Sequence, residues 1–218
     1  YPMKKLLLFG ILISSLSFAE NNIIEFRAGV SPSSKFEVSP SKKAKTSYEI
    51  STEYRYLLTN NTEIGAGIAY QNHGKLKKFT DIEDANLKVN VMDTKLYNSI
   101  PIYFTTRYNF KNDTAITPYV KANIGYSINV NNKNSSHYET IAKKTGTVLD
   151  SGDLKKYNAK NGMYYAIGAG IQYKGFVADL SYQINTAKIE GTRYDGRKDN
   201  GNANNRRITL GFGYQFGF

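Results

Sequence analysis

The chain has 218 residues, no cysteine and a formal net charge of +11 at pH 7. The absence of cysteine excludes a disulfide-stabilised fold, and the basic charge by itself favours nucleic acid or anionic lipid as a partner. The 18 Tyr, 11 Phe and 18 Gly, together with the absence of Trp, are unusual for a soluble domain. The destination of the chain in the cell therefore decides between these partners.

The first segment has the pattern of a secretory signal peptide. Residues 3–5 include two lysines, residues 6–16 are mostly apolar, and residues 17–19 place small residues around Phe18. The apolar run is shorter than the roughly 20 residues that a membrane-spanning helix needs. We therefore expect residues 3–19 to be cleaved during export through the Sec pathway. Export leaves residues 20–218 as one domain and makes nucleic acid an unexpected partner.

Eight later segments alternate between apolar and polar residues, which is typical of strands because successive side chains point to opposite faces. In the first of them, Ile24, Phe26 and Val30 share one face, and Glu25 and Arg27 share the other. The eight segments are residues 23–30, 46–58, 62–71, 96–110, 116–130, 163–173, 176–189 and 206–218. Each segment can supply the roughly 9–11 residues of a tilted transmembrane strand.

The connections between these segments alternate in length. Three are short, at residues 59–62, 111–115 and 174–175, and four are long and polar, at residues 31–45, 72–95, 131–161 and 190–205. A soluble sandwich also shows alternating strands, but it has no reason to place short turns at one end and long loops at the other. Short periplasmic turns and long extracellular loops are the topology of outer-membrane barrels.

These observations predict an all-β fold, an eight-stranded antiparallel up-and-down transmembrane β-barrel. In lipid only a closed sheet leaves no unpaired strand edge. Residues 85–92 also alternate, and we expect them to extend the fourth strand above the membrane. A ten-stranded barrel would need residues 76–84 as a lipid-facing partner, and that segment is too charged.

Three stretches carry a resemblance to a known family. They are residues 99–110, which begin Ser-Ile-Pro-Ile-Tyr-Phe, residues 117–126 and residues 165–171. The chain resembles the outer-membrane β-barrel domain family, which is related to opacity proteins and to small eight-stranded X-type barrels. This resemblance implies the barrel fold and a place in the bacterial outer membrane. It implies function only broadly, because such barrels include adhesins, host-factor binders and structural proteins.

The polar faces of the predicted strands place ten charges inside the barrel: Glu25, Arg27, Glu49, Glu53, Arg55, Glu63, Arg107, Lys121, Asp179 and Arg207. Isolated charges in such an interior are very costly, whereas paired ones are tolerated. An eight-stranded barrel is just wide enough for side chains to fill it. We therefore expect a charge-balanced plug. A narrow pore or proton-linked path is the alternative.

The last strand and the aromatic residues carry two further predictions. The terminal strand ends on Tyr214, Phe216 and Phe218, which resembles the signal read by the barrel-insertion machinery. Aromatic residues also gather near both ends of the strands, as in the aromatic girdles of membrane barrels. They are Tyr56, Tyr108, Phe110, Tyr173, Phe176, Phe216 and Phe218 toward the turns, and Tyr48, Tyr70 and Tyr126 toward the loops.

The long loops hold the basic excess. The third loop supplies the candidate contact residues Lys143, Lys144, Lys155 and Lys156, and further lysines are Lys35, Lys42, Lys43, Lys45, Lys75, Lys77, Lys78 and Lys160. Cations there would lie beside the phosphates of outer-membrane lipid and lipopolysaccharide. Contact with an acidic host-surface ligand and plain solubility are the other interpretations.

The sequence indicates no enzyme, no metal site and no cofactor. His73 and His137 lie in separate predicted loops, and there is no H-x-x-x-H, no cysteine and no G-x-S-x-G. Asp81, Glu83 and Asp84 could join His73, but carboxylates among lysines are typical of a solvated loop. The sequence therefore predicts a role in surface interaction, adhesion or envelope structure. A narrow channel or transporter for small molecules is the alternative.

Overall fold

The structure of the chain is a computed structural model that describes residues 21–38, 42–92, 94–131, 133–134, 137–153, 157–192 and 198–218. The predicted signal peptide at residues 3–19 lies outside these ranges. All the secondary-structure elements assigned in the described residues are strands. Among these residues there is no helix with the length and apolar character needed to cross a membrane.

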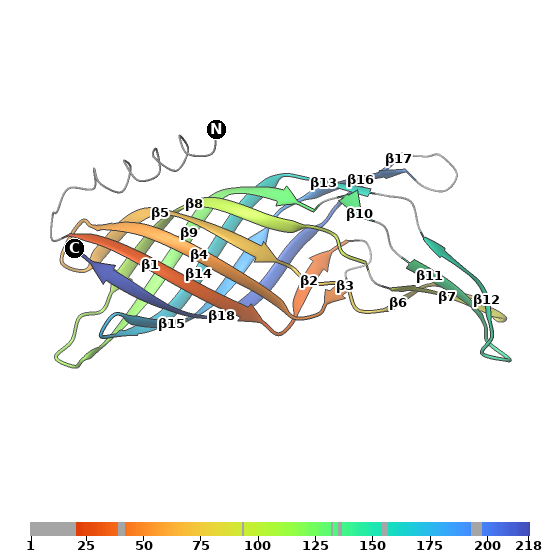
Figure 1. The fold of residues 1–218 in the computed structure, drawn as a ribbon, viewed down its shortest axis with the longest axis horizontal. Helices are drawn as coiled ribbons and strands as arrows, with labels where there is room; N and C mark the ends of the chain where they lie inside the picture. The colour runs from red at the N-terminus through yellow and green to blue at the C-terminus, as the bar shows by residue number, and fades with distance from the viewer. Residues whose placement is uncertain are drawn as a thin grey trace, which may run out of the picture.

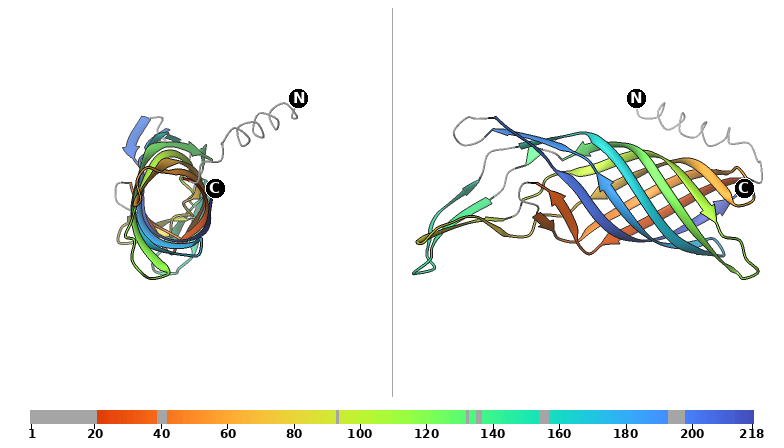
Figure 2. Two further views of the ribbon diagram at one scale, coloured as in Figure 1. Left: turned by 90° about the vertical axis from the view of Figure 1, so that its left-hand side faces the viewer. Right: turned by 180° about the vertical axis from the view of Figure 1, so that it is seen from behind.

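Eight long strands form a closed antiparallel barrel, as Figures 1 and 2 show. They are β1 (Asn22–Ser31), β4 (Ser47–Leu57), β5 (Thr62–Asn72), β8 (Asn98–Asn109), β9 (Ile116–Val130), β14 (Gly162–Tyr173), β15 (Phe176–Asn185) and β18 (Asn204–Gly217). Each pairs with the next in sequence. The ring closes where β1 pairs with β18, from Ile23 opposite Gly217 to Val30 opposite Leu210. The predicted eight-stranded barrel is confirmed.

The two faces of the barrel wall have opposite chemistry. The outward face exposes large apolar side chains, among them Phe26 at 57%, Ile50 at 59% and Ile167 at 67%. The inward face buries polar and charged groups, with Arg55 fully buried. A continuous exposed apolar band suits hydrocarbon, and a polar interior is typical of membrane barrels. The period of two in the sequence therefore sets both faces.

Glycines on the inward face make room for the largest interior side chains. A Cβ added at Gly67 would lie 2.6 Å from the ring of Tyr103, and one at Gly170 would lie 2.7 Å from the ring of Tyr119. A Cβ at Gly211 would lie 2.1 Å from the guanidinium of Arg27. Large side chains of neighbouring strands therefore fill the space beside the inward-facing glycines.

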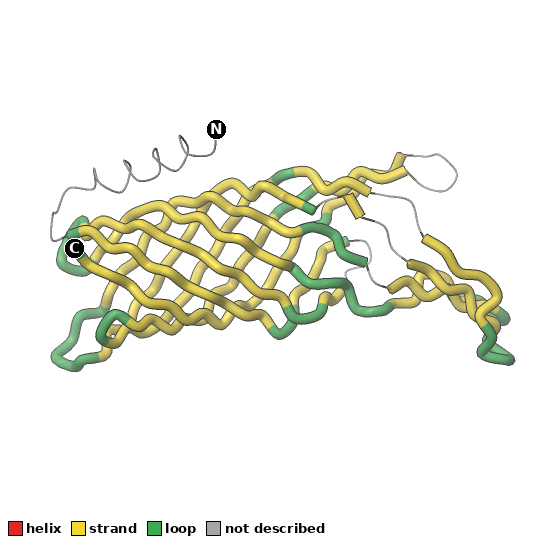
Figure 3. The backbone as a smooth tube through the Cα atoms, in the orientation of Figure 1, coloured by secondary structure: helices red, strands yellow, loops and turns green. Residues whose placement is uncertain are grey.

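The two ends of the barrel differ as the loop lengths predict (Figure 3). At the turn end, residues 58–61, 110–115 and 174–175 connect the strands. Lys174 and Gly175 have φ values of 46° and 85°, the positive pair that a two-residue hairpin turn of type I′ requires. The backbones of Asn22 and Phe218 exchange two hydrogen bonds at this end, 2.9 and 3.1 Å long.

The long connections at the loop end contain further strands, and among their residues the sequence analysis expected strand only at residues 87–92 and 188–189. They are β2 (Ser34–Glu37), β3 (Lys42–Ala44), β6 (Phe79–Glu83), β7 (Leu87–Met92), β10 (Lys133–Asn134), β11 (His137–Ala142), β12 (Val148–Asp153), β13 (Tyr157–Lys160), β16 (Lys188–Thr192) and β17 (Lys198–Asn202). β2 and β3 continue the barrel sheet beyond β18. The others form two four-stranded sheets, β10-β13-β16-β17 and β12-β11-β7-β6.

Two predicted strand boundaries are wrong. Residues 87–92 do not extend the fourth barrel strand, because β7 pairs with β6 and β11 and is separated from β8. The separating segment turns inward and buries Leu96 and Tyr97. The predicted strand 176–189 is too long. β15 ends at Asn185, and Ala187 is buried between it and β16.

A small apolar core closes the loop end of the barrel. We call it the cap. It comprises Phe36, Ala44, Leu76, Leu96, Tyr97, Ala159, Ala187 and Ala203, all at most 4% exposed. Its members come from all four long connections. The cap therefore ties the loops to one another directly above the polar lumen.

Candidate functional site

All ten predicted interior charges lie in the lumen, and each is at most 8% exposed. Toward the turn end, the guanidinium of Arg55 binds three carboxylates, those of Glu25 at 2.9 Å, Glu53 at 2.6 Å and Glu63 at 2.7 Å. Arg107 lies beside the same group, 3.5 Å from Glu25. This lower cluster contains three acids and two arginines, so each guanidinium lies beside more than one carboxylate.

Toward the loop end, a second cluster gathers around Glu49. This carboxylate pairs with Arg27, and with Arg207 at 2.5 Å. Arg27 also binds Asp179 at 2.6 Å. Lys121 links the two clusters, because its Nζ lies 3.6 Å from Asp179 and 3.6 Å from Glu53 of the lower cluster. The ten charges therefore form one connected network.

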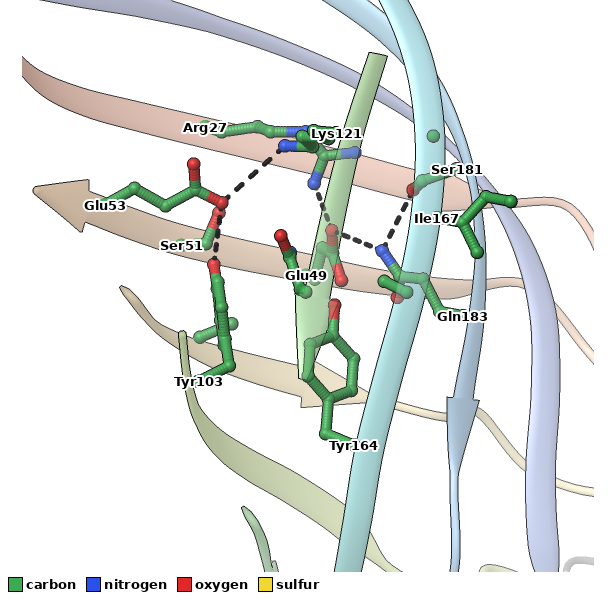
Figure 4. Close-up of a pocket in the computed structure, with 14 residues that line it drawn as sticks. Arg27, Glu49, Ser51, Glu53, Tyr103, Lys121, Tyr164, Ile167, Ser181 and Gln183 are labelled. Carbon is green, nitrogen blue, oxygen red and sulfur yellow. Dashed lines mark hydrogen bonds and ion pairs between the residues drawn. The ribbon is translucent and has the colours of Figure 1, made fainter. Parts of the chain in front are cut away.

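Little empty space remains inside this network. Figure 4 shows the middle of the lumen, where Tyr103 and Tyr164 approach Glu49 and Glu53. The cavity there has a volume of about 10 Å³. That is at most enough for about one water molecule. The two tyrosine rings lie 5.2 Å apart at their centroids and fill the space between the clusters.

Neutral side chains complete the network, and the sequence analysis did not single them out. Gln71 and Gln183 each donate to Glu49 at 3.0 Å. Tyr103 donates to Glu53 at 3.0 Å, and Gln172 accepts from Arg107 at 2.6 Å. All four occupy inward positions of the predicted strands. The alternation could have found their face, but not their partners, because partners depend on strand register.

His73 lies at the upper boundary of the lumen, just beyond the end of β5, and is fully buried. Its Nε2 lies 2.8 Å from the Ser99 hydroxyl, and its ring packs against Tyr97 and Phe36 at 5.2 and 6.0 Å between centroids. Burial lowers the pKa of His73 well below its usual value, and the nearby Arg207 lowers it further. His73 therefore lies in a connection between strands, where the sequence placed it, but is buried rather than solvated.

The loop sheet β12-β11-β7-β6 is tied together by ion pairs. Lys143 Nζ lies 2.9 Å from Glu83 and donates to the carbonyl of Asp84 at 2.9 Å. This contact lowers the pKa of Glu83, and the backbone N–H groups of Leu87 and Asn86 lower that of Asp84. Lys144 is exposed. The other two candidate contact residues, Lys155 and Lys156, lie outside the described residues.

The end of β18 carries an aromatic cluster at the turn end of the barrel. Tyr214 and Phe216 lie 4.7 Å apart, Phe176 of β15 lies 5.0 Å from Tyr214, and Phe26 of β1 lies 6.5 Å from Phe216. These rings cover the seam where β18 meets its two neighbours. Phe218 follows the last strand residue and closes the seam through its backbone.

No group of three or more His, Asp or Glu side chains that could hold a metal ion occurs in the part of the chain that the structure describes. Asp81 and Glu83 are exposed on or near β6, whereas His73 is buried under the cap. The structure therefore does not bring these residues together.

Comparison with known proteins agrees with this geometry. A family model described as the outer membrane protein β-barrel domain matches residues 6–216. The uncharacterized protein PM1543 of Pasteurella multocida (strain Pm70) is 27% identical in an alignment of 240 positions that covers 99% of this chain and 99% of its own. OprG of Pseudomonas aeruginosa has a TM-score of 0.51 at 14% identity, covering 91% of this chain and 97% of its own. Ail of Yersinia pestis has a TM-score of 0.41 at 15% identity, covering 91% and 100%. At these identities the likeness to OprG concerns the fold alone.

Proposed function

The chain belongs to the family of outer membrane β-barrel domains and resides in the bacterial outer membrane, and we propose that it is a surface-interaction protein with a closed lumen. In such barrels the long loops are extracellular and the short turns periplasmic. The proposal places the binding function in the loop sheets. The barrel then serves as a rigid support that the loops can vary without disturbing.

The observation that carries this proposal is the order within the loops. The sheet β12-β11-β7-β6 joins the second and third loops through a continuous strand ladder and the ion pair of Lys143 with Glu83. Lys78 adds a pair with Glu139 at 3.6 Å. A surface that is ordered before binding loses less conformational entropy when a partner binds. Ordered loops therefore support a binding role.

The exposed side chains of this sheet indicate the chemistry of the partner. Lys144 is exposed at the β11–β12 turn, and Val148 and Leu149 next to it are 50% and 58% exposed. A cation beside apolar side chains suits an acidic polymer or an acidic protein surface on a host cell. An enzymatic activity forms no part of the proposal. Envelope structure is the function that remains if no surface ligand binds.

The test removes residues 134–158, which include β11 and β12. Attachment of intact cells to host cells, and to surfaces coated with an acidic polysaccharide, should weaken. Attachment of the wild type should itself fall as salt is raised, because exposed charges are screened beyond about 8 Å at physiological ionic strength. The deletion keeps Ala159 in the cap, so the barrel should stay folded and heat-modifiable.

A point variant separates binding from folding. Lys144→Glu should weaken attachment, whereas the control Lys111→Glu, in the exposed turn 110–115 at the other end of the barrel, should leave it unchanged. If both the deletion and Lys144→Glu attach like the wild type, the loops do not bind a surface ligand. Envelope structure is then the better proposal.

A further inference from the structure

His73 is a titratable side chain in direct contact with the cap. Its ring packs edge-to-face against Phe36 and Tyr97, two members of the cap, at 6.0 and 5.2 Å between centroids. Phe36 lies in the first long connection and Tyr97 at the end of the second, and all three side chains are fully buried. The His73 ring therefore joins two connections above the lumen, and a change in its charge acts on their contact.

The hydrogen bonds around the ring suit a neutral His73. The Asn129 amide is oriented by the carbonyl of Lys160, and its Oδ1 accepts from the Ser99 hydroxyl at 2.8 Å. Ser99 therefore accepts from His73 Nε2 in their contact of 2.8 Å, so Nε2 holds the single proton of the neutral ring. A second proton would go to Nδ1. The ring lies near the Asn205 side chain, but Nδ1 makes no hydrogen bond of normal geometry with any described residue.

The charged groups that face His73 are cations. Burial lowers the pKa of His73 most, and Arg207 of β18 and Lys95 of the β7–β8 connection lower it further. Tyr97 of the same connection is neutral, because burial raises the pKa of its hydroxyl. The strands β2 and β8 face the ring with the uncharged side chains described above. A second ring proton therefore meets positive charge on two sides.

The acidic side chains of this region have other partners. Glu49 of β4, in the upper cluster of the lumen, is bound by Arg207 at 2.5 Å. Glu37 of β2 pairs with the exposed Arg206 at 2.9 Å. In the part of the chain that the structure describes, no carboxylate forms an ion pair with His73. Protonation of His73 would therefore place a further cation in a buried site without an anion for it, which is costly.

Opening of the cap breaks far fewer contacts than opening of the barrel. Just beyond His73 in the chain, Lys77 donates a backbone hydrogen bond to the carbonyl of Lys43 at 2.9 Å, and Leu76 donates to that of Thr94 at 2.7 Å. The barrel strands are instead joined by ladders all the way round. Segments with few contacts open locally at a lower free energy than the rest of a fold. A charge on His73 therefore acts first on the cap.

We propose that His73 is a pH-sensitive latch for the cap. When the ring takes up a second proton, the cap separates from it and the first two long connections lose their order, while the barrel stays closed. Histidine is the side chain whose charge changes between about pH 5 and 8. The inference does not depend on the proposed surface-interaction function, because it concerns the folding of the connections and not their binding to a ligand.

The test measures amide hydrogen exchange of the folded protein in detergent, for the wild type and His73→Gln at each pH. Intrinsic exchange varies with pH but is the same for both proteins at one pH, so the ratio of their rates reports the latch. Below about pH 6.5, the Leu76 and Lys77 amides of the wild type should exchange faster relative to those of the variant. The expected rise is up to about tenfold for each pH unit.

Controls separate the latch from other effects of acid. The Gln215 amide, which donates to the carbonyl of Gly175 at 2.8 Å at the turn end, should keep the same ratio at every pH. His137, the other histidine of the chain, is present in both proteins, so its titration cancels. His73→Phe keeps a ring against the cap but takes up no proton, so its Leu76 amide should lack the rise in acid whatever its rate at neutral pH.

Two outcomes overturn the proposal. One is an equal effect of acid on the cap amides of the wild type and His73→Gln. The other is an acid effect in the wild type that extends to Gln215, because the whole barrel would then be opening.

Discussion

Arg55 and Arg107 occupy neighbouring positions in the lower cluster but differ in how many carboxylates depend on them. Arg55 is the partner of three carboxylates, whereas Arg107 lies near Glu25 and Glu63, which Arg55 also binds. Arg55→Met should therefore lower the free energy of unfolding by about 3–5 kcal/mol, the cost of leaving buried charge unpaired. Arg107→Met should cost about 1–3 kcal/mol, because mainly hydrogen bonds to the neutral side chains of Asn109, Gln172 and Gln215 are lost.

The measurement is reversible unfolding of both variants in lipid or detergent by urea titration. Phe104→Leu, on the exposed outward face next to the same region, serves as a control that leaves the network intact. Equal losses for the two arginine variants would show that the lower cluster does not depend on Arg55 in particular.

His73 gives the protein a pH-dependent stability. Burial holds the pKa of His73 below its unfolded value of about 6.5, and the positive charges of Arg207 and Lys95 act in the same direction. The unfolded chain then binds a proton at His73 that the folded chain does not. The stabilisation is complete above about pH 6.5 and is lost as the pH falls below it, by at most about 1.4 kcal/mol per pH unit.

The unfolding temperature of the wild type should therefore fall more steeply between pH 6.5 and pH 5 than that of His73→Gln, whose side chain can still bond to Ser99. Identical slopes for the wild type and His73→Gln would mean that His73 does not titrate on unfolding in this range.

The barrel strands could be predicted because each repeats the same period of two over ten or more residues, and because lipid on one face and charge on the other make the period plain. Most of the loop strands could not, although the alternation of β7 was visible. β2, β3 and β13 are three or four residues long, and so short a stretch does not establish a period. The cap contains Phe36 and Tyr97, which meet each other and His73 only after the first two long connections fold over one another.

The inward face of the strands could likewise be predicted only in part. Alternation places Glu49 and Arg207 on one face, but their contact at 2.5 Å depends on the register of β4 and β18 around the barrel. The inward glycines were only empty positions in the sequence. Their role is clear in the structure, where Gly67 makes room for the ring of Tyr103 and Gly170 for that of Tyr119.

The seam between β1 and β18 carries the prediction on assembly. The end of β18 resembles the signal for barrel insertion, and the Phe218 backbone makes two hydrogen bonds with Asn22. Deleting Phe218 should reduce the heat-modifiable protein in the outer membrane. It should have little effect on the stability of a barrel folded in detergent, because the seam keeps the ladder from Ile23 to Val30. Phe218→Tyr should insert normally, and normal insertion of the deletion would contradict the interpretation.

The distribution of charge over the whole molecule separates the interior from the loop end. The lumen holds five acids and five bases, so it contributes no net charge to the +11 of the chain: Glu25, Glu49, Glu53, Glu63 and Asp179 against Arg27, Arg55, Arg107, Lys121 and Arg207. The excess therefore lies outside the lumen. Such a field attracts anions to the loop end and leaves the interior neutral.

A neutral, filled interior leads to the prediction on conductance. Buried polar side chains extend from Arg107 near the turns to His73 under the cap, and the cavity in the middle of the lumen has a volume of about 10 Å³. An ion would have to shed its water and separate buried ion pairs, which is very costly. The purified wild type should therefore show no steady single-channel steps in planar bilayers. Reproducible steps from the wild type would favour the narrow channel instead.

A variant that opens the lumen provides a positive control for the absence of conductance in the wild type. Tyr103 and Tyr164 line the central cavity, and replacing both by Ala removes the two rings that fill the space between the charge clusters. This double variant should conduct measurably. The matched control, Phe104→Ala with Tyr165→Ala, removes the adjacent outward-facing rings, which are 50% and 40% exposed, and should stay silent. If the inward double variant is silent as well, the charge network alone closes the lumen, and the tyrosines serve only to pack it.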